Sequence, residues 1–302
     1  MLNNPTLAQY SEMVKNERAF VLETIKKHQP KKILEIGIAA GANSALILDY
    51  LESNQLLDST MLYAMDYSEY YYRDLCKEES NGGGAITSCR KSGFLVNQLL
   101  PHLTSYYHLY TDGFCANHLD KIGGDIDLCI IDTVHAAPGE AMDFLMVLPY
   151  LKPNAVIILH DIAYHTFSPI PFGKHRNICA LLFFALIGDK CIPPQYEPYG
   201  HLFQNIGSCT LDPNQNQYVE LYFRLLHLPW TYIPSQKDLD AFISHITKHY
   251  DKTFVDAFGE ILTLQKKWFD QEAAQRRPQR TPMLKRWQRS IKKRINFVRE
   301  RF

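Results

Sequence analysis

The sequence of 302 residues contains no apolar run long enough to cross a bilayer. Its longest apolar stretches, AVIIL at 155–159 and ALLFFALI at 180–187, fall far short of the roughly 20 residues that a membrane-spanning helix needs. The N-terminus lacks the basic start and apolar core of a secretion signal. We therefore expect a cytoplasmic protein without a membrane span.

The chain also lacks a CxxC pair, and its seven cysteines are an odd number. They stand at positions 76, 89, 115, 129, 179, 191 and 209. Two of them, Cys129 and Cys179, lie within apolar segments. This pattern favours free thiols in a reducing compartment over a disulfide framework or a zinc site.

A net charge of zero conceals a strongly basic C-terminal tail. Residues 276–302 contain eleven Lys and Arg against one acid, so the tail carries +10 and the rest of the chain −10. Apolar residues recur every three or four positions in the tail, at Leu284, Trp287, Ile291, Ile295, Val298 and Phe302. The pattern predicts a basic amphipathic helix that contacts the inner membrane surface as a peripheral element. Docking on the acidic body and a subunit contact within a homo-oligomer are the alternatives, and no nucleic-acid partner is expected.

Strand-like and helix-like patterns alternate along residues 31–162. The expected strands are 31–37, 61–66, 105–113, 126–132 and 155–159, with a later one at 201–211. This alternation predicts an α/β fold with a Rossmann-like, mostly parallel twisted sheet, helices on both faces and a C-terminal helical extension. The predicted parts are an N-terminal helical segment (1–30), the Rossmann-like domain (31–212), a helical addition (213–275) and the tail helix (276–302).

Parallel sheets of this kind bind ligands beyond the carboxyl ends of their strands. In ILEIGIAAGANS, residues 33–44, the acid Glu35 ends a strand and Gly37 and Gly41 follow. Such glycines let a ligand approach the backbone closely, and the next helix offers free N–H groups. A dinucleotide-binding GxGxxG would need glycine at Ala39, and no Gly-Lys-Ser/Thr of a P-loop follows, so both nucleotide motifs are disfavoured.

The same stretch resembles motif I of class I S-adenosylmethionine-dependent methyltransferases. The resemblance implies that Glu35 and the two glycines, with Ser44, contact the cofactor. It also implies that an acid ending the second strand, here Asp66, takes the two ribose hydroxyls. Asp112 and Gly113, which end the third strand, are then expected at the adenine.

Residues 126–162 resemble a branch of these enzymes that includes macrocin O-methyltransferase-like and cephalosporin hydroxylase-like proteins. The matching elements are Asp132-Thr133-Val134-His135, Leu151-Lys152-Pro153-Asn154-Ala155 and His160-Asp161. The branch has Gly-Asp where this chain has Thr133-Val134, and a glycine pair where it has Asn154-Ala155. The resemblance implies O-methylation of a small-molecule or sugar hydroxyl.

Three residues at the strand ends are therefore candidate catalysts: Asp132, His135 and His160. Histidine suits removal of the hydroxyl proton near neutral pH, because its unperturbed pKa is about 6.5. Asp132 and Asp161 are also candidate ligands of Mg²⁺, although imidazole in place of a carboxylate at His160 disfavours that ion. The alternatives are a catalytically inactive binding or scaffold protein with this fold and an NAD-dependent oxidoreductase.

Overall fold

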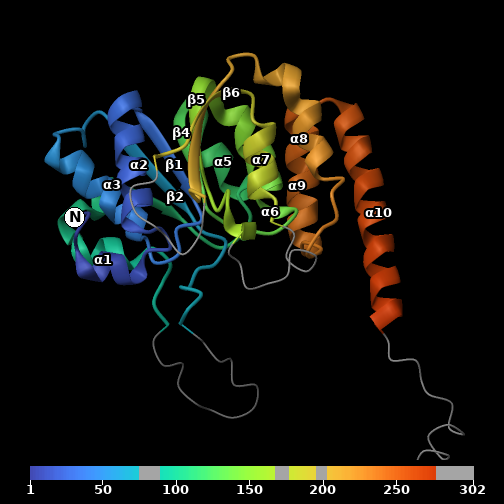
Figure 1. Ribbon diagram of the computed structural model, residues 1–302, viewed down its shortest axis with the longest axis horizontal. Coiled ribbons are helices and arrows are strands. Elements are labelled where there is room, and N and C mark those ends of the chain that lie inside the picture. The colour runs from blue at the N-terminus through green and yellow to red at the C-terminus, as the bar shows by residue number, and fades with distance from the viewer. Residues whose placement is uncertain (75–88, 167–176, 195–202, 277–302) are drawn as a thin grey trace, which may run out of the picture. The chain divides into compact units, whose positions relative to one another are not determined.

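The computed structural model describes residues 1–74, 89–166, 177–194 and 203–276, so nearly all of the predicted tail helix lies outside it. Residues 1–261 form one compact unit and residues 262–302 a second. Seven strands of the first unit build one sheet in the order β3-β2-β1-β4-β5-β7-β6 (Figure 1). They are β1 Lys32–Ile36, β2 Met61–Met65, β3 Tyr107–Tyr110, β4 Ile126–Ile131, β5 Leu151–His160, β6 Gly188–Cys191 and β7 Ile206–Leu211.

The sheet is parallel from β3 to β5, and β7 alone runs antiparallel to its neighbours β5 and β6. The order of strands along the sheet reverses between β1 and β4, so the carboxyl ends of β1, β2 and β4 lie side by side. This geometry confirms the predicted Rossmann-like α/β fold. It brings together the polar residues that follow the three strands, which the sequence separates by up to a hundred positions.

Helices cover both faces of the sheet (Figure 1). One face packs against α2 Lys15–His28, α3 Ala42–Ser53 and α4 Phe94–Leu99, whose apolar side chains join those of the strands in one core. The other face carries α5 Ala116–Ile122, α6 Gly139–Val147 and α7 Cys179–Ala185. Every residue of α6 is buried, because it lies between the sheet and the C-terminal helices α8 Val219–Leu225 and α9 Gln236–His249.

Two local predictions differ from the structure. The N-terminal helical segment predicted over 1–30 consists of two helices, α1 Pro5–Tyr10 and α2, and the break between them reaches the cavity described below. The strand expected at 155–159 begins earlier, at Leu151, and contains a bulge where residues 152–155 stand opposite Asp127 of β4. Within the bulge Asn154 has a φ of +63°, which asparagine tolerates better than most residues.

The five cysteines of 115, 129, 179, 191 and 209 are free thiols, as expected. Cys89 is disulfide-bonded, with a partner outside the described residues, so the expectation of free thiols is wrong at this position. The last helix of the described residues, α10, spans Lys252–Arg276. Among the described helices, none combines the length and apolar character that crossing a bilayer requires.

Candidate active site

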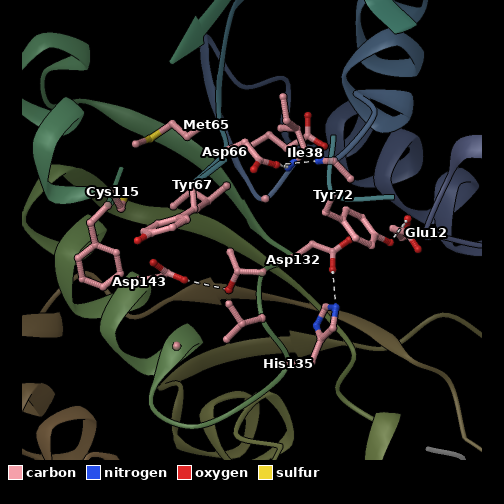
Figure 2. A pocket seen from close by; sticks show the side chains of 18 of the residues that line it. Glu12, Ile38, Met65, Asp66, Tyr67, Tyr72, Cys115, Asp132, His135 and Asp143 are labelled. Atoms are coloured by element: carbon pink, nitrogen blue, oxygen red, sulfur yellow. Dashed lines mark hydrogen bonds and ion pairs between the residues drawn. The ribbon is translucent and has the colours of Figure 1, made fainter. Parts of the chain in front are cut away.

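A cavity of about 630 Å³ opens at the carboxyl ends of β1, β2 and β4 (Figure 2). Its charged side chains are carboxylates, with one imidazole among them. They are Glu12, Glu35, Asp66, Asp132, Asp143, Asp238 and His135. The site thus lies where the sheet topology predicts it.

The glycine turn after β1 forms one wall, and its two glycines are required by geometry. Gly37 has φ +84°, and a Cβ there would lie 1.9 Å from the backbone oxygen of Asp132. Gly41 has φ +81°, and a Cβ would lie 2.8 Å from the Cα of Gly93. A side chain at position 37 would overlap the Asp132 backbone, so only glycine allows the turn to pack directly against the loop after β4.

Glu35 is buried at the base of this wall. It accepts hydrogen bonds from Asn43 Nδ2 at 3.0 Å and Ser44 Oγ at 2.5 Å. Burial raises the pKa of Glu35 to about 7, although these two hydrogen bonds oppose the rise. Ser44 therefore holds Glu35 and does not itself line the cavity. Asn43, which the sequence analysis missed, does line it, and its buried Oδ1 has no hydrogen-bond partner among the described residues.

Asp66 stabilises the turn from the end of β2. Its Oδ2 accepts from the backbone N–H of Ile38 at 3.2 Å and of Ala39 at 2.9 Å, and its Oδ1 accepts from Ser68 N at 2.9 Å. A carboxylate has about four acceptor positions, so only one remains for a ligand. Asp66 lines the cavity as expected, but it offers one ribose hydroxyl a direct bond rather than two.

Of the two residues expected at the adenine, only one borders the cavity. Gly113 lines the cavity, whereas the Asp112 side chain is exposed and does not. The wall here is instead built around Tyr67, whose hydroxyl donates to Asp238 Oδ2 at 3.1 Å. Asp238 belongs to α9, so the C-terminal helices complete the cavity.

His135 stands in the loop after β4, with its ring between two carboxylates. Its Nδ1 lies 2.7 Å from Asp161 Oδ2, a charge contact without hydrogen-bond alignment, and its Nε2 lies 3.9 Å from Asp132 Oδ1. Burial by itself would lower the pKa of this imidazole. The neighbouring carboxylates, chiefly Asp161 and then Asp132 and Glu140, outweigh burial and raise it to about 9.

His160 does not face the cavity. It is buried behind Asp132, with Nδ1 at 3.1 Å from Asp132 Oδ1 and Nε2 at 3.2 Å from Glu17 Oε2. Burial opposes the charged form, but the charges of Asp132 and Asp161 hold the pKa of His160 well above its ordinary value. The structure thus places this candidate base as a buried cation that fixes the Asp132 carboxylate.

The expected magnesium ligands Asp132 and Asp161 both lie beside His135, and one oxygen of each also lies close to His160 Nδ1, at 3.1 Å and 3.2 Å. Donor atoms of Asp132, His135 and Asp161 lie within 4.8 Å of one another, so the three residues form a geometrically possible metal site, but one that includes an imidazole. Asp161 Oδ1 already accepts from Asn205 Nδ2 at 2.6 Å. Mg²⁺ prefers oxygen ligands in octahedral geometry, and this arrangement does not fit it.

Two segments that the sequence analysis did not assign to the site also line it. Tyr10, Ser11, Glu12 and Met13 come from the break between α1 and α2, and Tyr232, Ile233, Pro234 and Ser235 precede α9. Asp143, on α6, accepts from Thr133 Oγ1 at 2.9 Å, and burial raises its pKa to about 7. No sequence motif marks these segments, because they reach the cavity only through the packing of distant helices.

The sheet order, the glycine turn and the acids at successive strand ends are those of a Rossmann-like α/β fold with a ligand site at its switch point. Residues 34–162, a little under half of the chain, match the family described as methyltransferase domain. This stretch is a methyltransferase domain, as the sequence analysis predicted. The narrower branch, of macrocin O-methyltransferase-like and cephalosporin hydroxylase-like proteins, stays a prediction.

Several solved structures resemble the chain. The O-methyltransferase TomG from Streptomyces achromogenes, solved with SAM, has a TM-score of 0.48 and 11% identity, covering 70% of this chain and 91% of its own. An O-methyltransferase from Bacillus cereus, solved with SAH, has a TM-score of 0.45 and 14% identity, covering 68% and 86%. No curated protein matches the sequence. These similarities are too distant to assign chemistry, which therefore depends on the residues of the site.

Proposed function

We propose that the chain is an S-adenosylmethionine-dependent O-methyltransferase that acts on a hydroxyl of a small molecule or glycan, with His135 as general base. One observation carries the proposal. Gly37 lies directly against the backbone of Asp132, so the cofactor turn and the pair Asp132–His135 open into the same cavity. A methyl donor held by the turn and a hydroxyl held by the pair would therefore be neighbours.

The turn offers acceptors suited to the ammonium group of the cofactor. The Glu35 carboxylate and the unpartnered Asn43 Oδ1 both line the cavity. Asp66 has one free acceptor position for the ribose, and Gly113 borders the region expected for the adenine ring. When bound, S-adenosylmethionine supplies a methyl group already activated on its sulfonium.

The protein must still orient the acceptor and take its proton. Asp161 lies against Nδ1 of His135, which leaves Nε2 toward Asp132 and the cavity. The charge of Asp161 favours a proton on Nδ1, so the hydroxyl proton would pass to Nε2. Asp132, fixed by His160, would hold the hydroxyl beside the base. No step is assigned to magnesium, because the residues do not fit it.

The basic tail, 276–302, adds a second part to the proposal: contact with an anionic membrane surface. Its +10 charge and its apolar stripe support this role, since each basic residue near such a surface contributes about 1 kcal/mol. Self-association and the lack of a nucleic-acid partner stay predictions from the sequence.

Two measurements test the proposal. Calorimetry should show binding of both S-adenosylmethionine and its demethylated product, and chromatography should show product formed with a panel of polyhydroxylated small molecules. His135→Gln should keep cofactor affinity within about tenfold but lower turnover by about 10²- to 10⁴-fold. His108→Gln, a strand histidine that does not line the cavity, is the matched control.

Each outcome has a clear meaning. If neither cofactor form binds, the chain is a scaffold protein or, if NAD binds instead, an oxidoreductase. Full turnover in His135→Gln would remove this residue from the role of base.

A further inference from the structure

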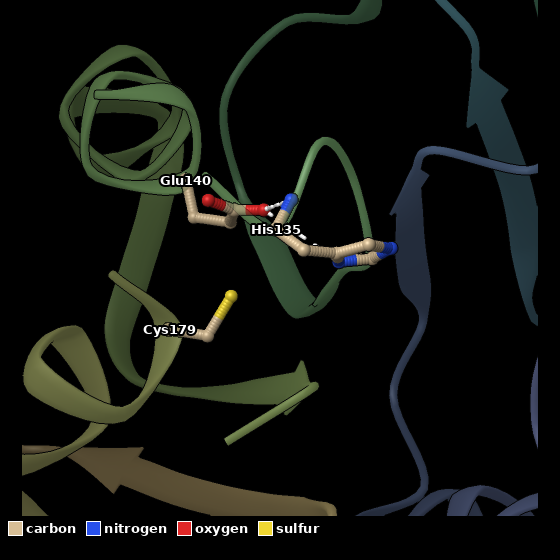
Figure 3. A group of neighbouring side chains, drawn as sticks. All are labelled: His135, Glu140 and Cys179. Atoms are coloured by element: carbon tan, nitrogen blue, oxygen red, sulfur yellow. Dashed lines mark hydrogen bonds and ion pairs between the residues drawn. The ribbon is translucent and has the colours of Figure 1, made fainter. Parts of the chain in front are cut away.

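A second cluster lies behind His135, on the side away from the cavity. Donor atoms of His135, Glu140 and Cys179 all lie within 4.8 Å of one another (Figure 3). They come from the loop after β4, the first turn of α6 and the first residue of α7. Nδ1 of His135 lies 3.8 Å from Glu140 Oε1. Three different donor types, nitrogen, oxygen and sulfur, thus converge from three elements.

The Glu140 carboxylate is incompletely satisfied. Its side chain is fully buried, and Oε1 accepts from the backbone N–H of His135 and from Thr133 Oγ1 at 3.3 Å. Its other oxygen, Oε2, is buried and has no hydrogen-bond partner among the described residues. A buried, unpartnered carboxylate oxygen costs about 1–3 kcal/mol or more, so a cation beside it would be stabilising. The Cys179 thiol, which forms no disulfide, is buried on the same side, where burial and then its interaction with the Glu140 carboxylate raise its pKa.

The donor set indicates which cation fits. Zn²⁺ binds thiolate, imidazole and carboxylate in tetrahedral geometry, whereas Mg²⁺ takes oxygen ligands. Three protein ligands are present, the number found in zinc sites that keep their fourth position for water or another ligand. Ligand atoms around zinc lie closer together than 4.8 Å, so the side chains would draw in slightly.

We propose that His135, Glu140 and Cys179 form a zinc-binding site, and that zinc bound there inhibits the enzyme. Binding replaces the thiol proton of Cys179 and the Nδ1 proton of His135, and both protons pass to solvent. With Nδ1 on the metal, the remaining ring proton sits on Nε2. Nε2 can then donate a hydrogen bond but accepts no proton, so the base is lost. The inhibition rests on the proposed function, whereas the zinc site does not.

Cobalt(II) as a spectroscopic substitute for zinc tests the site without any acceptor substrate. All proteins carry Cys191→Ser, so that this exposed thiol contributes no thiolate-to-cobalt band of its own. Titration of the full chain with Co²⁺ should give the thiolate-to-cobalt band in the near ultraviolet and the visible bands of a tetrahedral ion. Cys179→Ala should lose the thiolate band, and Cys209→Ala, a buried cysteine of β7, should keep it.

Zinc affinity gives the second readout. In competition with a chromophoric chelator, Cys179→Ala and Glu140→Gln should each weaken Zn²⁺ binding at least about tenfold. Circular dichroism checks that the variants fold, and Glu140→Gln keeps the test valid if Cys179→Ala does not. A thiolate band of equal strength in Cys179→Ala, or none in the parent protein, would overturn the site.

Methyl-transfer assays separate this inference from the proposed function. Zinc should inhibit the parent protein and Cys209→Ala, EDTA should reverse the inhibition, and Cys179→Ala should resist it. Cobalt bands without zinc inhibition would confirm the site and overturn the assignment of His135 as base. Inhibition that persists unchanged in Cys179→Ala would overturn the inhibitory role of this site.

Discussion

The raised pKa of His135 gives the most direct test of the catalytic arrangement. A base must be unprotonated to act, and with a pKa of about 9 only about 1% of His135 is unprotonated at pH 7. The ratio of kcat to KM should therefore rise about tenfold per pH unit and level off above pH 9, a total gain of about 100-fold. Asp161→Asn removes the charge that contributes most to raising this pKa, so the midpoint should move down toward 6.5, the value of a free imidazole.

Asparagine suits position 161, because Asp161 has φ +59° and asparagine tolerates this conformation. The rate profile is measured by release of the demethylated cofactor, and the pKa itself by NMR titration of labelled histidine, assigned with His135→Gln. Asp143→Asn is the matched control, since Asp143 lines the cavity but does not contribute to the shift. An unchanged midpoint in Asp161→Asn would refute the view that this carboxylate tunes the base.

Three further predictions concern the cofactor wall and the tail. Gly37→Ala should abolish binding of the demethylated cofactor and lower the melting temperature, because its Cβ would overlap the Asp132 backbone. The control Gly124→Ala, with open space around it, should change the free energy of unfolding by less than about 0.5 kcal/mol. Equal behaviour of the two variants in calorimetry and thermal unfolding would contradict this prediction. Cofactor affinity should fall as pH drops through about 7, where Glu35 gains a proton. Ser44→Ala removes a hydrogen bond to the ionised form of Glu35, so it should move the midpoint of this pH dependence upward in calorimetric titrations. A pH-independent affinity would exclude Glu35 as the partner of the cofactor's ammonium group. Deletion of 276–302 should leave cofactor binding intact and reduce flotation with anionic liposomes, and unchanged flotation would remove the membrane role.

The buried carboxylates of the site are held in two different ways. Glu35 and Asp143 are both carboxylates whose pKa burial raises to about 7, and each is held by hydroxyl or amide donors rather than by a cation. Asp132, in contrast, is held by the buried cation His160. The first two are therefore able to change charge near neutral pH, whereas Asp132 is fixed for positioning.

The sequence by itself determined the sheet and the places where chemistry would gather. Alternating apolar strands and helical patterns predicted a mostly parallel sheet, because strands joined by crossover helices are covered on both faces, as β4 is. The same patterns fixed the carboxyl ends of the strands, and with them Glu35, Gly37, Asp66, Asp132 and His135 at one edge. These features are local, and local spacing is what a sequence shows.

Tertiary structure alone decided which of these residues face a ligand. Asp112 and His160 have the right residue type at the right strand ends, yet one is exposed and the other is buried against Glu17 of a distant helix. The pKa of His135, the unpartnered oxygen of Glu140 and the walls supplied by α1 and α9 likewise depend on contacts between segments far apart in the chain. Burial and charge act through space, so these properties arise only when the packed fold has brought the segments together.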